Sequence, residues 1–208
     1  MYLVVDCETS GLPRNWRAPV ADVANWPRAV QIGWALYDAG QARVLAESRI
    51  VRPEGFTIPP DAVRIHGITT ERAMAEGLPI ADVLGALSSA ASSAKVIVAH
   101  NANFDGSVIG AEYLRLGQKP PFGPPSMICT MRQSTDFCRL PGPYGYKWPT
   151  LEQLYSILHG TGFSGAHEAG ADVAACAACF FELVKRGVIT VGASGARRAL
   201  GESHRAGR

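Results

Sequence analysis

The sequence predicts an α/β fold in which helices cover both faces of a mixed five-stranded sheet. Three strand-like segments come first, separated by short connections, as in an antiparallel meander. Strands and helical segments then alternate, as they do when parallel strands are joined by crossover helices. The chain has 208 residues, of which 47% are hydrophobic, so a single domain can bury a full core.

Residues 3–6, 30–37 and 43–51 are the three initial strands. The turn at residues 38–40 contains aspartate and glycine, which favour a tight reversal between the second and third strands. These three segments should therefore pair in an antiparallel manner.

Helices and strands alternate in the middle of the chain. Residues 79–91 carry apolar side chains at amphipathic helical spacing and lead into a fourth strand at 96–99. A helix is expected at 105–116, ending at Gly117, and residues 127–129 are short enough to be a fifth strand at the edge of the sheet.

Two more helices follow. Residues 150–158 begin with Thr150 as N-cap, and Gln153 completes a capping box. The last helix should begin near Ala171 and end at Gly187.

The expected organisation is one domain over residues 1–188 and a basic, flexible tail over 189–208. From Lys185 onward the chain has six basic residues and one acidic residue, and the remainder has 14 basic and 17 acidic residues. Net charge therefore does not decide whether the partner is a polyanion. The sequence predicts neither a membrane span nor a signal peptide, and its five cysteines suggest a reducing, cytoplasmic location.

Three short, distant motifs contain the residues with catalytic chemistry. They are DCETSGL at 6–12, HNANFD at 100–105 and HEAGAD at 167–172. Acidic groups that converge cost free energy unless a cation neutralises them, so their convergence would imply a divalent metal. The candidate residues are Asp6, Glu8, Asp105, His167 and Asp172.

Local structure predicts how these residues meet. Asp6 and Glu8 are two apart, so both leave the end of the first strand on one face. Asp105 follows the fourth strand near the start of a helix, where the helix dipole tolerates negative charge. His167 and Asp172 would lie about 140° apart on a continuous helix. We therefore place His167 in a loop between Gly165 and Gly170, and Asp172 on the first helical turn.

Oxygen ligands favour two Mg²⁺ or Mn²⁺ ions over zinc. The expected chemistry is phosphodiester hydrolysis, in which one metal activates a water, His167 accepts its proton as general base, and the second metal stabilises the leaving oxyanion. Asp6 is the best candidate to contact both ions.

In combination and in order, the three motifs resemble those of the DEDDh group of DnaQ-like 3′-to-5′ exonucleases. This group includes polymerase proofreading subunits, RNase T and oligoribonuclease. Further similarity lies in Gln31-Ile32-Gly33, in residues 66–69 and in residues 151–154, so the resemblance covers roughly residues 1–187.

The resemblance implies an RNase H-like fold and stepwise release of nucleoside 5′-monophosphates from DNA or RNA 3′ ends, with single strands favoured. It implies that Asp6, Glu8, Asp105 and Asp172 are the metal ligands and that His167 is the general base. It also admits a polymerase or another replication protein as a partner.

Six further residues are candidates for contacts with the 3′-terminal nucleotide: Thr9, Gly11, His66, His100, Asn101 and Phe104. Turn and packing roles compete with this interpretation for Thr9, Gly11, Asn101 and Phe104. For the two histidines the competing interpretation is a satisfied side chain at a strand or loop end.

Three features depart from the family pattern. Cys129 replaces a frequent aspartate and should alter either a helix cap or the local polarity, and Gly170 should loosen the loop that carries His167. Residues 13–27 form an insertion with Trp16 and Trp26. These tryptophans either stack on bases or anchor the loop, and anchoring is the favoured interpretation.

Two other functions remain open at this stage. One is a non-catalytic nucleic-acid-binding or polymerase-associated module of the same fold. The other is a different nuclease, either an RNA-specific exoribonuclease or an RNase H-like endonuclease. The motifs do not distinguish DNA from RNA, and they do not determine the oligomeric state.

Overall fold

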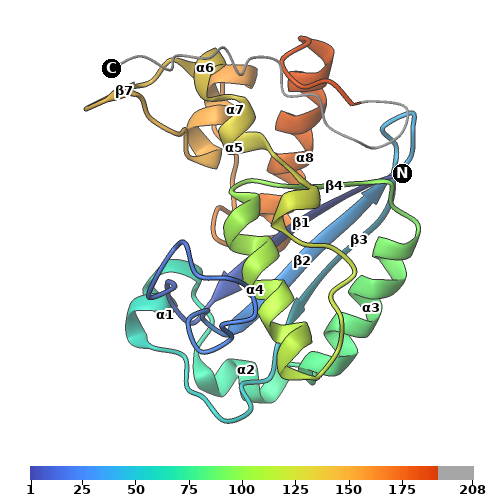
Figure 1. Cartoon of the computed structure of the whole chain (residues 1–208), viewed down its shortest axis with the longest axis vertical. Coiled ribbons are helices and arrows are strands. Elements are labelled where there is room, and N and C mark those ends of the chain that lie inside the picture. The colour runs from blue at the N-terminus through green and yellow to red at the C-terminus, as the bar shows by residue number, and fades with distance from the viewer. Residues whose placement is uncertain (192–208) are drawn as a thin grey trace.

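A mixed five-stranded sheet forms the centre of the protein. The structure is a computed structural model that describes residues 1–191 (Figure 1). The strand order is β3-β2-β1-β4-β5. Strand β2 pairs in an antiparallel manner with both β1 and β3, whereas β4 pairs in a parallel manner with both β1 and β5. The strands are β1 (Tyr2–Thr9), β2 (Ala29–Tyr37), β3 (Arg43–Ile50), β4 (Val96–Ala99) and β5 (Met127–Cys129). The predicted fold class is therefore confirmed, including the initial meander and the edge position of the fifth strand.

Helices pack on both faces of this sheet (Figure 1). Successive side chains of a strand point to opposite faces, so β1 contributes to two separate cores. Leu3 and Val5 pack with α3 (Ile80–Ser92) and α4 (Ala102–Arg115). Val4, between them, packs with α7 (Leu151–His159) and α8 (Ala169–Lys185).

Two helices begin earlier than predicted. Helix α4 begins at Ala102 instead of residue 105, because Asn101 adopts a left-handed backbone conformation that reverses the chain directly after β4. Helix α8 begins at Ala169 instead of Ala171, because the Glu168 carboxylate accepts the backbone N–H of Ala171 and caps the first turn.

Several short elements were not predicted. They are α1 (Pro60–His66), α2 (Thr70–Glu76), a 3₁₀ turn (Pro124–Ser126), α5 (Thr130–Gln133), α6 (Thr135–Cys138) and the small hairpin β6 (Pro141–Gly142) and β7 (Gly145–Tyr146). Helices of seven residues or fewer contain too few apolar positions to show a clear helical period. Helices α1 and α2 each bury one alanine in a third, small core beside β2.

The packed body extends past the predicted boundary at residue 188. Ile189 is buried, and Val191 packs against the same core as α7 and α8. The rest of the predicted tail, residues 192–208, lies outside the described residues. Within residues 1–191, no helix is both long and apolar enough to cross a membrane.

The pairing of β1 with β4 is short, so the second half of β1 has no partner strand on its β4 side. These parallel strands pair only from Tyr2–Val96 to Val4–Val98, whereas β1 continues to Thr9. Asp6 and Glu8 therefore both lie within β1, past its pairing with β4, whereas the predicted strand ended at Asp6.

Candidate active site

Asp6 and Glu8 project from β1 toward the face that α8 covers. They alternate with Val5 and Cys7, whose side chains pack on the opposite face. Along the antiparallel neighbour β2, Asp6 lies opposite Gly33 and Glu8 opposite Gln31. Residues of the second strand therefore border both acids.

Gly33 and Gln31 seat the start of α8 on the sheet. A Cβ atom at Gly33 would lie 2.6 Å from the carbonyl oxygen of Ala169, so glycine is required for this close approach. The Gln31 amide accepts the Ala169 N–H at 3.2 Å and donates to the Glu168 carboxylate at 3.0 Å. Asp172, in the first turn of α8, is thereby held above β1.

Asp105 reaches β1 from the first turn of α4 and is almost fully buried. Its Oδ1 accepts the backbone N–H of Cys7 at 3.1 Å and the Cys7 thiol at 3.4 Å. Because β1 is no longer paired with β4 at this point, the carboxylate satisfies an otherwise free strand N–H.

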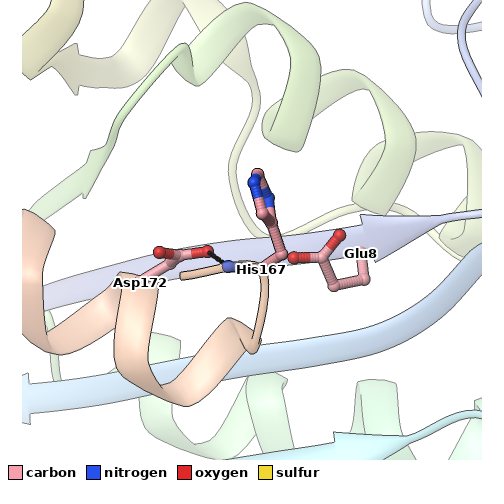
Figure 2. Close-up of side chains that lie close together, drawn as sticks. All are labelled: Glu8, His167 and Asp172. Carbon is pink, nitrogen blue, oxygen red and sulfur yellow. Dashed lines mark hydrogen bonds between the residues drawn. The ribbon is translucent and has the colours of Figure 1, made fainter. Parts of the chain in front are cut away.

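His167 lies in the loop before α8, as predicted, and its side chain is exposed. Its φ of 67° is in the left-handed region, which is uncommon for a residue other than glycine. The His167 N–H donates to Asp172 Oδ2 at 2.9 Å. One ligand atom each of Glu8, His167 and Asp172 lie within 4.8 Å of one another, and Figure 2 shows the imidazole between the two carboxylates.

Burial and nearby negative charges raise the pKa values of Asp6, Glu8, Asp105 and Asp172. Burial raises the pKa of Asp6 well above its usual value, and the charges of Asp105, Asp172 and Glu8 raise it further. Burial is also the main cause that raises the pKa of Glu8 to about 7, with Asp172 adding to it. Burial raises the pKa of Asp105 to about 7 and that of Asp172 above its usual value.

This donor set fits a divalent cation. Four carboxyl groups converge, and each would be more acidic if positive charge were placed among them. Carboxylate oxygens are the ligands that Mg²⁺ and Mn²⁺ prefer. Asp6, Glu8, Asp105 and Asp172 are the residues that would hold such ions, as the sequence predicted.

The other residues predicted to contact the substrate differ in the contacts that they make within the protein. The Thr9 hydroxyl donates to the carbonyl of Gly11 at 2.7 Å, which is a turn role. Asn101 is the left-handed residue before α4, and its side chain makes no capping bond. Phe104 is half-buried beside Asp105 and contacts Trp16. Substrate contact by these four residues stays a prediction.

The two remaining histidines differ. His100 is occupied within the protein, since its Nδ1 pairs with the Thr130 hydroxyl at 3.0 Å and its Nε2 with the carbonyl of Pro149 at 3.1 Å. These two bonds favour the competing interpretation of His100 as a satisfied histidine, and its substrate role stays a prediction. His66 lies close enough to Thr9 and His167 for both to influence its pKa, which burial lowers overall. Its substrate role stays a prediction.

Sequence reasoning missed the group that supports the His167 loop. The Glu168 carboxylate accepts hydrogen bonds from the Gln31 amide and from the Ser48 hydroxyl of β3, in addition to capping α8. A polar Gln31 within an otherwise apolar nine-residue strand was the available signal.

Two departures from the family pattern also have structural consequences. Cys129 is the N-cap of α5 and makes no side-chain capping bond there, consistent with the predicted change of a cap. The role predicted for Gly170 is wrong, because this residue lies inside α8 and not in the loop. A Cβ at Gly170 would come within 3.0 Å of the Glu168 carboxylate and 3.2 Å of the Ser48 Cβ, so this glycine accommodates the Glu168 contacts.

Comparisons with known proteins agree with this arrangement. The RNase T family, described as exonuclease, matches residues 3–180. A Mycobacterium tuberculosis protein provisionally named a bifunctional exonuclease/endonuclease is 33% identical over 131 residues, which are 63% of this chain and 19% of that protein.

Solved structures of E. coli Exonuclease I share the fold. The complex with a dT13 oligonucleotide has a TM-score of 0.68 and 24% identity, covering 88% of this chain and 40% of that chain. A zinc-bound form with single-stranded DNA has the same TM-score and identity, covering 89% and 40%. This chain thus spans well under half the length of these relatives.

The occupied ring of His100 predicts a pH-dependent contribution to stability. Burial lowers its pKa to about 4, whereas an unfolded histidine titrates near 6.5. The unfolded state therefore binds a proton that the folded state does not, and the stability that neutral His100 contributes is lost as the pH falls from 6.5 toward 4.

We expect His100→Gln to lower the free energy of unfolding at pH 7, and this loss to shrink by about 1 to 3 kcal/mol at pH 4.5. Urea unfolding of wild type and variant at both pH values measures the difference. His159→Gln, at the exposed end of α7, is the control. A loss that is equal at the two pH values would contradict the assigned role.

The acid cluster predicts that Asp6→Asn changes the melting temperature in opposite directions, relative to wild type, without and with a divalent metal. At pH 8, Asp6→Asn should raise the melting temperature of the metal-free protein, because a neutral amide replaces a carboxyl group whose ionisation burial and the neighbouring acids oppose. The same variant should lose most of the rise that Mg²⁺ or Mn²⁺ causes in the wild type. Thermal scans with EDTA and with each metal test this.

The metal effect should also be larger at pH 8 than at pH 5.5. Glu8 and Asp105 have folded-state pKa values raised to about 7, so at low pH protons compete with the cation. Asp82→Asn, an exposed acid on α3, is the matched control. A metal-free Asp6→Asn protein that is less stable than wild type would indicate a structural role for Asp6 instead.

Proposed function

The chain belongs to the RNase T family of exonucleases, and from this premise we propose that it is a metal-dependent 3′-to-5′ exonuclease. The proposed reaction is hydrolysis of the terminal phosphodiester bond of a single strand, with release of a nucleoside 5′-monophosphate. The observation that carries the proposal is the convergence of four carboxyl groups from β1, α4 and α8 beside an exposed imidazole.

Asp6, Glu8, Asp105 and Asp172 would hold two divalent cations. When bound, these ions supply Lewis acidity for activating a water and for stabilising the leaving oxygen. Asp6 is the best candidate to contact both ions, because the charges of all three other acids act on it. Glu8 and Asp172 lie beside His167, so they define the side of the site at which proton transfer takes place.

His167 is the proposed general base. Its ring is exposed while the acids around it are largely enclosed, so it can accept a proton from water at the surface of the site and release it to solvent. Its backbone is tied to Asp172 and directly precedes the Glu168 contacts, and these bonds hold the loop in its left-handed conformation. The ring stands beside the Glu8 and Asp172 carboxylates, with one ligand atom of each residue within 4.8 Å of the others (Figure 2).

Single-stranded DNA is the substrate class that we expect first. This expectation rests on fold-level analogy, since the E. coli Exonuclease I structures contain single-stranded DNA. RNA is the alternative substrate, and zinc the alternative metal, since one of those structures is a zinc-bound form. Both belong in the first assay.

Wild-type protein should shorten a 5′-labelled single-stranded oligonucleotide from its 3′ end in Mg²⁺ or Mn²⁺, and less well in Zn²⁺. Asp6→Asn should reduce this activity to background, because a metal ligand is lost while side-chain size is kept. Denaturing gels of matched DNA and RNA strands measure both substrates. Asp82→Asn should keep full activity, and a circular single strand should stay intact. Cleaved circles, or equal activity of Asp6→Asn and wild type, would reject the proposal.

His167→Gln should lower kcat by about 10² to 10⁴-fold, the range expected for loss of a general base. The rise in melting temperature caused by Mg²⁺ should persist, because the four carboxylates remain. Single-turnover rates with saturating enzyme separate this chemical effect from binding. His159→Gln should match wild type, and a His167→Gln rate within threefold of wild type would exclude His167 as the base.

A further inference from the structure

The insertion at residues 13–27 gives its two tryptophans different environments. Trp26 is 3% exposed, lies in the core beneath α3 and α4, and donates its indole N–H to the carbonyl of Pro19 at 3.2 Å. It anchors the loop, as predicted. Trp16 is 47% exposed, and its ring centroid lies 5.7 Å from that of Phe104.

The loop is held firmly around Trp16. The buried side chain of Asn25 accepts the backbone N–H of Asn15 at 2.7 Å and donates to the carbonyl of the same residue at 3.0 Å. Arg115 of α4 donates to the carbonyls of Val23 and Trp26 at 2.6 and 2.7 Å. The residue before Trp16 is thus fixed to the scaffold, so an exposed aromatic ring is positioned in advance of any ligand.

The position of this ring is informative. Phe104 directly precedes Asp105, so Trp16 lies next to the second motif although it comes from outside all three motifs. Two exposed arginines, Arg14 and Arg17, flank it in the sequence. An exposed aromatic ring with basic neighbours is the combination that binds single-stranded nucleic acid without sequence preference.

We propose that Trp16, supported by Phe104, is a stacking site for an unpaired nucleobase near the 3′ end of the bound strand. This inference rests on the proposed function and specifies its substrate as single-stranded. The two rings are in direct contact, which leaves no space for a base between them. The base therefore lies on the exposed face of Trp16, while Phe104 supports the ring and Arg14 and Arg17 lie near the strand's phosphates.

Binding measurements in an Asp6→Asn background with Mg²⁺ test the proposal, because cleavage should not interfere there. Fluorescence anisotropy of a 5′-labelled single strand should show that adding Trp16→Ala raises Kd about 5- to 150-fold. Trp16→Phe should retain most of the affinity. Trp148→Ala, which removes an exposed tryptophan between β7 and α7, is the matched control and should leave Kd unchanged.

Strands with one abasic site at the first, second or third position from the 3′ end identify the stacked base. At one of these positions the abasic site should weaken binding of the Asp6→Asn protein as much as Trp16→Ala does, and the two changes together should cost no more than either alone. If Trp16→Ala has no effect on Kd, or if its effect is the same at all three abasic positions, the stacking site is wrong.

A separate measurement keeps this outcome distinct from failure of the proposed function. Wild-type hydrolysis of the p-nitrophenyl ester of thymidine 5′-monophosphate with Mn²⁺ reports phosphodiester chemistry without a longer strand. An active enzyme with an unchanged Trp16→Ala affinity would overturn only the stacking site. An enzyme inert toward both the ester and oligonucleotides would overturn the proposed function.

Discussion

Electrostatic repulsion among four clustered carboxyl groups, two of them buried and two partly buried, is the constraint around which this protein is organised. Burial and mutual charge together raise the pKa of Asp6 well above its usual value, so the cluster costs folding free energy unless a cation is added. The fold reduces this cost locally. Asp105 and Asp172 both lie in the first turns of helices, where the helix dipole favours negative charge, and the Cys7 N–H bonds Asp105.

Two residues with an uncommon backbone conformation lie close to the acids of β1, α4 and α8. Asn101 and His167 are both non-glycine residues in the left-handed region. Asn101 is the N-cap of α4, and His167 precedes the N-cap of α8, so each lies at the start of a helix that carries one of the acids. Such conformations persist only where surrounding contacts enforce them. At His167 those contacts are the bonds that link Gln31 and Ser48 to Glu168, so the second and third strands control the loop of the proposed base.

The insertion at residues 13–27 likewise combines a firmly held backbone with one exposed side chain, that of Trp16. Buried Trp26 and Asn25 provide the support, together with Arg115 from α4, and Trp16 remains accessible. Exposing the Trp16 ring forgoes part of the free energy that its burial would contribute.

The sequence by itself determined the sheet, its main helices, the family resemblance and the acid-and-histidine set, because these depend on local periodicity and on ordered motifs. The early starts of α4 and α8 required Asn101 and Glu168 in their folded context. Only the tertiary structure decided that His100 is occupied by Thr130 and Pro149, that Gly170 makes room for Glu168, and that Trp16 and Trp26 have different roles. The physical reason is that each of these outcomes depends on which distant backbone or ring approaches a side chain, and spacing along one chain contains no such information.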